Sequence, residues 1–363
     1  MHSNLVAVSL LLWLCSLPCY GQDQLRVVSS TPLPPAVIHK GWYGVDPARL
    51  GCLQDGSFLV AEGHDAWRVS PLISRVSSNG TLLWTVDSEN FSGLGRTDLY
   101  DFAPGPGGEL YLLVKRVVRR YFYRDDKGNR VPGGRSDDPG NWLVRYDNEG
   151  RFVDRKPSLA AHDVRIAVFP GGKIFILSYT IQGMPIRVGD PPHPWAVLAG
   201  VFSPDGVLLH RVTPPDFFLD HSSGRPRRPL SIPLPILGPD GNVYVVKEGE
   251  TPALAVISPD GDVLRSIALA VPSGGALEYS RLFGQHLLAR MTFDQPHPPS
   301  GGIKTSLVEF DTTTGKMVSN YLTTKIGWWP GCDAGSGLVG INPVAQSLEV
   351  LEPTVRVKPD ATF

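Results

Sequence analysis

Two carboxylates and an imidazole recur at one spacing in this 363-residue chain. Asp46, Asp98 and His162 each lie ten residues before the glycine of a repeated turn. Oxygen and nitrogen ligands that converge in this way can hold a divalent cation. The same spacing gives Ser231 and Lys325 in later units, and the cationic Lys325 argues against a complete cage of ligands. The pattern defines a candidate cation site, with loop capping and water binding as the alternative role of the three side chains.

Familiar catalytic motifs are absent from the sequence. It has no Gly-x-Ser-x-Gly elbow, no His-Glu-x-x-His motif, no Cys-x-x-Cys pair and no phosphate-binding glycine loop. The formal net charge of −1 also argues against a nucleic-acid partner. The residue pattern therefore favours binding over catalysis.

Glycine turns recur along the chain in two interleaved series, and each turn precedes a short run of β-forming residues. The 39 glycines and 34 prolines of the chain also favour turns over long helices. The first series contains Gly56, Gly108, Gly172 and Gly241, with degenerate turns at Gly284 and at Gly335 and Gly337. The second series contains Gly80, Gly150, Gly206, Gly261 and Gly315. Each unit is thus predicted to hold two hairpins, or four strands.

The predicted fold class is all-β, a six-bladed β-propeller of four-stranded blades that forms one domain over residues 22–353, followed by a tail at 354–363. Six turns in the first series and five in the second leave the last unit one strand short. The N-terminal segment Leu25–Pro32 has the pattern of an outer strand, so we expect it to complete the C-terminal blade and close the ring. Closure removes the exposed edges of an open array.

Cys52 and Cys332 occupy near-equivalent positions in the first and last units. These two units become neighbours only when the ring closes. We therefore predict a disulfide between the two cysteines, with a pair of buried free thiols as the alternative.

Two Ser-Pro-Asp-Gly segments, at residues 203–206 and 258–261, connect the chain to a known group of proteins. With them the chain resembles six-bladed propellers of the NHL-repeat type over roughly residues 24–353. The resemblance implies the fold and leaves the chemistry open, since such propellers include binding modules, lactonase-like metal enzymes and lyases. The metal ligands of the gluconolactonase-like members do not map onto this sequence.

The innermost strand of each propeller blade lines a central channel. Charged residues on these strands are expected to pair with one another or to order water, because an unpaired buried charge is unfavourable. The predicted channel-lining residues are Asp101, Asp163, Arg165, Glu278 and Arg281.

Long connections are expected to gather on one face of the ring. The tight glycine turns join the first strand to the second and the third to the fourth, whereas the insertions join the second to the third or one blade to the next. The insertion at residues 116–141 holds a basic loop, for which a solvated and self-paired state is the alternative to an anion site. Its arginines include Arg119, Arg120, Arg124 and Arg130.

Long loops on one face of a rigid scaffold usually carry the binding site. We therefore expect the loop-rich face, formed by second-to-third-strand and blade-to-blade connections, to bind a protein, peptide or glycan. The alternative function is that of a metal-dependent hydrolase, lactonase or lyase that uses a divalent cation at the channel mouth.

The first 21 residues have the pattern of a secretory signal. The apolar run at residues 5–15 is too short to span a bilayer, and small residues precede the expected cleavage point. A retained membrane anchor is the alternative. We expect a secreted or periplasmic monomer with no membrane association after cleavage.

Overall fold

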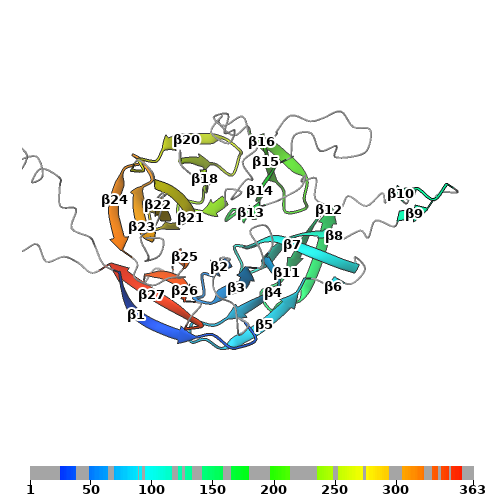
Figure 1. Cartoon of the computed structure of the whole chain (residues 1–363), viewed down its shortest axis with the longest axis horizontal. Coiled ribbons are helices and arrows are strands. Elements are labelled where there is room, and N and C mark those ends of the chain that lie inside the picture. Colours follow the sequence, from blue (N-terminus) through cyan, green and yellow to red (C-terminus); the bar gives the residue numbers. More distant parts are fainter. Residues whose placement is uncertain are drawn as a thin grey trace, which may run out of the picture.

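The computed structural model describes the strands of the chain and most of its tight turns (Figure 1). The described residues are 25–37, 49–63, 69–88, 90–91, 95–116, 122–124, 127–132, 141–157, 165–179, 197–212, 235–247, 252–272, 275–293, 305–322, 329–333, 337–342 and 345–353. No helix in this part of the chain has the length and apolarity needed to cross a membrane.

Six antiparallel sheets form the blades, numbered here by the order of their first strands. Blade 1 contains β2 (Arg49–Cys52), β3 (Phe58–Gly63), β4 (Val69–Val76) and β5 (Leu82–Asp87). Blade 2 contains β7 (Gly95–Pro104), β8 (Leu110–Arg116), β11 (Asn141–Tyr146) and β12 (Phe152–Pro157). Blade 3 contains β13 (Arg165–Val168), β14 (Ile174–Tyr179), β15 (Val197–Phe202) and β16 (Leu208–Val212).

The second half of the ring repeats this arrangement. Blade 4 contains β17 (Pro235–Leu237), β18 (Val243–Lys247), β19 (Ala253–Ile257) and β20 (Val263–Ala268). Blade 5 contains β21 (Gly275–Phe283), β22 (His286–Phe293), β23 (Thr305–Asp311) and β24 (Met317–Leu322). Blade 6 contains β25 (Trp329–Asp333), β26 (Leu338–Asn342), β27 (Ser347–Pro353) and β1 (Leu25–Pro32).

The blades stand around one axis with their first strands innermost (Figure 1). The chain is therefore an all-β, six-bladed propeller of four-stranded blades, and the predicted fold class is confirmed.

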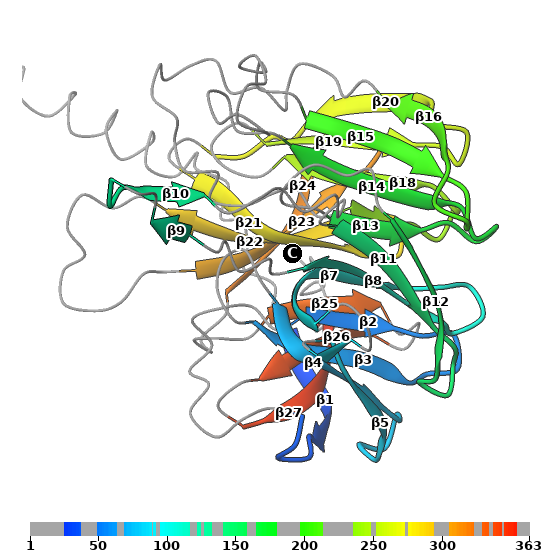
Figure 2. The ribbon, with the colours of Figure 1, turned by 90° about the vertical axis from the view of Figure 1, so that its right-hand side faces the viewer.

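The N-terminal strand closes the ring. β1 pairs antiparallel with β27 from Leu25 opposite Pro353 to Pro32 opposite Ser347. Figures 1 and 2 show the two strands side by side. Cys52 of β2 and Cys332 of β25 form a disulfide whose Cα atoms lie 5.7 Å apart. Both predicted closures, the strand and the disulfide, therefore join blade 6 to the start of the chain.

Most of the described tight turns are three-residue loops in which only the glycine takes a left-handed conformation. Blade 5 differs, because the Gly315 N–H donates to the Asp311 carbonyl across a four-residue loop and a two-residue loop at Gly284 separates Phe283 from His286. In the first turn the Gly56 N–H donates to the Leu53 carbonyl (3.0 Å), and the Leu53 N–H donates to the Ser57 carbonyl (2.9 Å). Gly56 has a φ of +80°, whereas among the described residues other than glycine only Gln346 has a positive φ. The Asp55 carboxylate accepts the Ser57 N–H (3.0 Å), which explains why an aspartate precedes this glycine.

The core lies in the seams between blades. Six clusters of buried apolar side chains each join one blade to the next. In β8, Leu110 and Leu112 pack against blade 1, whereas Tyr111 and Leu113 pack against blade 3. Because both faces are buried, the central strands are apolar at consecutive positions, while an outer strand such as β20 alternates between exposed and half-buried residues.

The second-series glycines also permit close contact between blades. A Cβ at Gly315 would lie 2.2 Å from the Ala268 carbonyl oxygen at the end of the outer strand of blade 4. At Gly284, the first-series glycine of the same blade, a Cβ would meet no atom within 4 Å. At all five second-series glycines, the added Cβ would contact a residue in the outer strand of the preceding blade. These residues are Thr31 for Gly80, Trp84 for Gly150, Lys156 for Gly206, His210 for Gly261 and Ala268 for Gly315.

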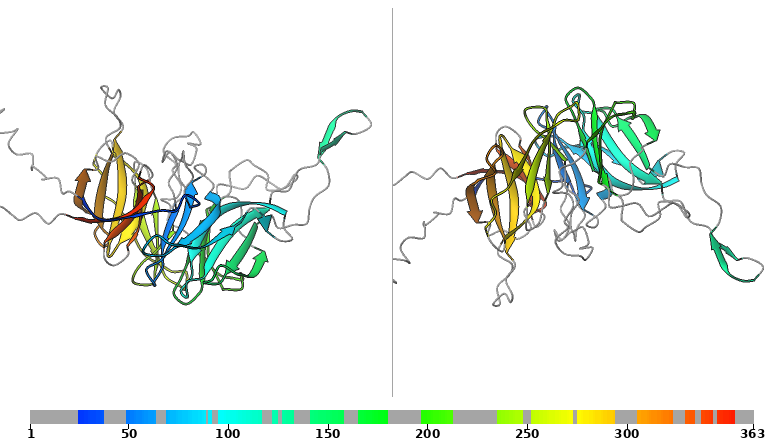
Figure 3. Two further views of the ribbon diagram at one scale, coloured as in Figure 1. Left: turned by 90° about the horizontal axis from the view of Figure 1, so that it is seen from below. Right: turned by 90° about the horizontal axis from the view of Figure 1, so that it is seen from above.

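Three short strands were not expected from the sequence. β6 (Asn90–Phe91) adds a fifth strand to the inner edge of blade 2 by pairing with β7. β9 (Phe122–Arg124) and β10 (Arg130–Pro132) form a separate hairpin within the insertion of blade 2. Figure 3 shows this hairpin outside the ring.

Gly315→Ala should destabilise the protein more than Gly284→Ala. Both glycines have left-handed φ values, +69° and +56°, so both variants lose about 1–2 kcal/mol to backbone strain. Only the alanine at 315 also meets the Ala268 carbonyl, which adds about 1–3 kcal/mol. Denaturant unfolding of both variants measures the difference, and equal losses would contradict a close contact between the blades.

Loss of the disulfide should weaken the ring without changing its topology. Replacing Cys52 and Cys332 together with serine should lower the free energy of unfolding by about 2–5 kcal/mol, because the unfolded chain gains freedom. Thiol titration gives an independent test: a chain that starts at residue 22, unfolded without reductant, should show no reactive thiol. Two reactive thiols would rule the disulfide out.

Candidate functional site

Two of the predicted channel-lining residues fasten neighbouring inner strands together. Asp101 of β7 and Arg165 of β13 are 1% and 3% exposed. Asp101 accepts the Ile166 N–H (3.0 Å), and the Arg165 guanidinium donates to the Tyr100 carbonyl (3.0 Å). These bonds join blade 2 to blade 3, so the two charged groups hold strands in place.

The remaining channel candidates are less informative. Arg281 of β21 donates to the carbonyl of Ser280 (2.8 Å). Glu278 lies in the same strand, opposite Arg290 of β22, and Asp163 falls outside the described residues.

The candidate cation site stays a prediction. Asp98 lies in β7, opposite Lys115 of β8, whereas Asp46 and His162 fall outside the described residues. Within the described ranges, no three His, Cys, Asp or Glu side chains lie close enough to share a metal ion.

Of the four arginines named in the basic loop of blade 2, two lie in the projecting hairpin. Arg124 of β9 lies directly opposite Arg130 of β10, and Arg119 and Arg120 fall outside the described residues. Like charges at opposite positions disfavour a strand pair, and a bound anion removes that penalty. The register is therefore compatible with an anionic partner at the hairpin.

One register position recurs in every blade and decides how each seam is filled. At this position the second, third and fourth strands of a blade each contribute one side chain that faces the next blade. We call these three side chains the seam row. From blade 1 to blade 6 the rows are Leu59, Arg75 and Trp84; Tyr111, Arg145 and Asp154; Phe175, Val201 and His210; Tyr244, Val256 and Arg265; Leu288, Glu309 and Ser319; and Val339, Val350 and Ser29.

In the seam between blades 1 and 2 an arginine fills the row. The buried Arg75 donates from Nε to the Ser57 hydroxyl (2.9 Å) and from Nη2 to the Asp55 carboxylate (2.6 Å). Its Nη1 donates to the Asn148 carbonyl in a tight turn of blade 2. The guanidinium thus links two turns of neighbouring blades.

In the seam between blades 5 and 6 the charged residue of the row is a carboxylate, and its contacts stay within blade 5. Glu309 is 7% exposed, and its Oε2 accepts the Tyr321 hydroxyl (2.6 Å). The Nδ1 atom of His286 hydrogen-bonds the other carboxylate oxygen. Both oxygens are therefore satisfied within blade 5.

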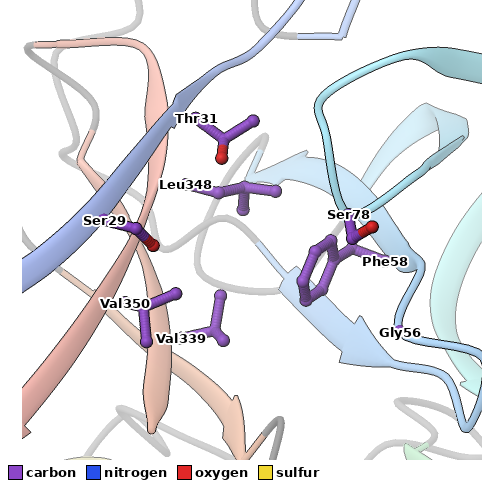
Figure 4. A pocket seen from close by; sticks show the side chains of 8 residues that line it. All are labelled: Ser29, Thr31, Gly56, Phe58, Ser78, Val339, Leu348 and Val350. Atoms are coloured by element: carbon purple, nitrogen blue, oxygen red, sulfur yellow. The ribbon is translucent and has the colours of Figure 1, made fainter. Parts of the chain in front are cut away.

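The seam between blades 6 and 1 is incompletely filled. Its row of two valines and a serine leaves a pocket of about 260 Å³ between the blades (Figure 4). Phe58, Val339 and Leu348 are the buried part of its lining. Three hydroxyl residues complete the lining: Ser29, Thr31 and Ser78.

Sequence reasoning missed this pocket, although the signal is present in the repeat. The seam row of blade 6 is the one made of small residues alone. Finding it from the sequence requires the exact register of three strands. One-residue bulges near the row, such as the shift between Val27 and Ser29, obscure that register.

Comparison with known proteins supports the fold. The chain is similar to a protein of unknown function from Dyadobacter fermentans, at 9% identity and a TM-score of 0.50, over 91% of this chain and 99% of the other. A protein of unknown function from Bacteroides caccae aligns at 12% identity and a TM-score of 0.44, over 84% and 95% of the two chains. The β-propeller domain of Cps50 (Swd1) from Myceliophteria thermophila aligns at 9% and 0.42, over 91% and 100%.

These similarities concern the fold alone. No family model matches the chain, and no curated protein matches it either. The resemblance to NHL-repeat propellers therefore holds for the fold of six four-stranded blades.

The hydrogen bonds that Ser57 and Arg75 donate to the Asp55 carboxylate should make the free energy of unfolding depend on pH. A hydrogen bond from the Ser57 hydroxyl, with the Ser57 N–H and the Arg75 guanidinium, lowers the pKa of Asp55 below its ordinary 3.8. The ionised carboxylate therefore stabilises the fold above about pH 4, and this contribution is lost as the pH falls through the lowered pKa.

Asp55→Asn tests this dependence. The variant should lose less than about 1 kcal/mol at neutral pH, because the carboxylate is 56% exposed and screened by solvent. Denaturant unfolding between about pH 2 and 7 should show the gap between the two proteins closing at the acid end. A gap that does not vary with pH would contradict the contact.

Proposed function

We propose that this protein is an exported, non-enzymatic interaction module that binds a protein, peptide or glycan through its loop-rich face. The observation that carries the proposal is the β9–β10 hairpin, which extends beyond the ring from the second-to-third-strand connection of blade 2 (Figures 1 and 3). An insertion that forms its own strand pair away from the core adds contact surface without adding to the seams.

The opposite face is occupied by contacts between blades. Lys173, next to a tight turn of blade 3, pairs with Asp260 in a tight turn of blade 4 (2.8 Å). The Gly284 N–H of blade 5 donates to the Asp333 carboxylate of blade 6 (2.9 Å). Groups committed to holding neighbouring blades together are poorly suited to exchanging partners, so the tight-turn face supports the scaffold.

The chemistry of the hairpin favours a partner with negative charge. The exposed Lys127 lies in its turn, and the opposed Arg124 and Arg130 add two cationic positions. Acidic side chains or anionic sugar groups supply the complementary charge. Rim charges of this kind mainly increase the rate of association, so binding should weaken as salt rises.

Site-specific photo-crosslinking tests the proposed face. A photoreactive residue at Asn129, in the hairpin turn, should give discrete adducts with a partner from the source organism, identified by mass spectrometry. The same residue at Val207, which is 61% exposed beside a tight turn of blade 3, is the matched control and should give none. Adducts of equal yield at both positions, or at neither, would contradict the proposal.

Removal of the loop provides the second readout. Deleting residues 119–138 should abolish capture of the crosslinked partner and leave the thermal unfolding temperature unchanged. Loss of folding on deletion would instead give the loop a structural role.

A further inference from the structure

The pocket in the seam between blades 6 and 1 has a closed apolar base and a polar mouth. Phe58, Val339 and Leu348 are 6%, 0% and 3% exposed, so the base is apolar and buried. Ser29 and Ser78 are exposed, and the pocket opens beside Gly56 and Ser78, which lie in the two tight turns of blade 1. Figure 4 shows the blade 6 side chains facing Phe58 and Ser78 across the space.

The hydroxyl groups at this mouth are available to a ligand. Within the described part of the chain, Ser29, Thr31 and Ser78 make no side-chain hydrogen bond to the protein. Each hydroxyl can donate one hydrogen bond and accept two. A ligand group that both donates and accepts hydrogen bonds, such as a hydroxyl, can therefore pair with any of them.

The lining also excludes several ligand classes. None of the eight lining residues carries a charge, so a charged ligand would lose its hydration without gaining an ionic partner. A sugar ring is disfavoured because most of its several hydroxyls would face the apolar base unpaired. What fits is a neutral ring, apolar over most of its surface, with one or two hydroxyl groups at an edge.

The volume agrees with a ligand of one ring. The pocket of about 260 Å³ lies just below the usual range for drug-sized ligands, about 300–1,000 Å³. An apolar cavity of about 150 Å³ is already large enough to take up benzene. The volume therefore suits a single substituted ring.

We propose that the seam between blades 6 and 1 is a binding site for a small neutral phenol-type compound. The ring inserts against Phe58, Val339 and Val350, and its hydroxyl pairs with Ser29, Thr31 or Ser78 at the mouth. The site lies beside the tight turns, apart from the loop-rich face, so it is independent of the proposed function.

NMR titration with phenol, toluene and glucose tests the ligand class. Phenol should shift the methyl signals of Val339 and Val350, and toluene should bind about threefold or more weakly. Glucose should leave these signals unchanged. Toluene binding as tight as phenol, glucose shifting the same signals, or no shift with phenol would each overturn the proposal.

A variant that fills the pocket tests its location. Val350→Phe should weaken phenol binding at least tenfold, because the new ring occupies the space between the blades. Val318→Phe is the matched control, since Val318 lies 50% exposed on the outer strand of blade 5, and it should bind phenol as the wild type does. Unchanged binding in Val350→Phe would overturn the proposal.

A second variant tests the mouth without adding bulk to the seam. Ser29 and Ser78 are exposed, so changing both to alanine should preserve the fold. Phenol should then bind about threefold or more weakly, whereas toluene should bind as before. Equal loss for both compounds, or no loss for phenol, would overturn the assignment of the hydroxyls.

Discussion

Every blade of this protein buries both faces of its central strands, so no blade is complete without a neighbour on each side. The alternation in β8 makes the constraint concrete, since Leu110 and Leu112 serve one seam while Tyr111 and Leu113 serve the next. A blade at the end of an open row would leave one apolar face in water. The ring, the close contacts of the second-series glycines and the pairing of β1 with β27 all follow from this requirement.

Different side chains fill the seams that cover the faces of the blades. Arg75 fills one seam and Glu309 another, and each charged group has hydrogen-bond partners. Blades 6 and 1 are joined by the Cys52–Cys332 disulfide, and β1 completes blade 6 by pairing with β27. With closure supplied in this way, small side chains are tolerated there and the pocket persists.

Much of the architecture could be predicted because its signals are local. A glycine with a left-handed φ marks each tight turn, and counting the turns exposes the missing strand that Leu25–Pro32 supplies. The two-residue β6 carries no such periodic signal, and neither does the Arg124–Arg130 pairing. The pocket was missed for another reason, since it depends on the sizes of side chains brought together from three strands and from the next blade.

The pairing of β1 with β27 also orders the events by which the protein is made. Leu25 is synthesised long before its partner Pro353. Until then β1 has no strand to pair with, and the first and last blades share an unsealed seam. Contacts of such long sequence separation slow folding and prolong the exposure of apolar edges. Among the described strands β1 is therefore synthesised first and stays unpaired until β27 follows, and a chain truncated before β27 lacks the partner that would close its ring.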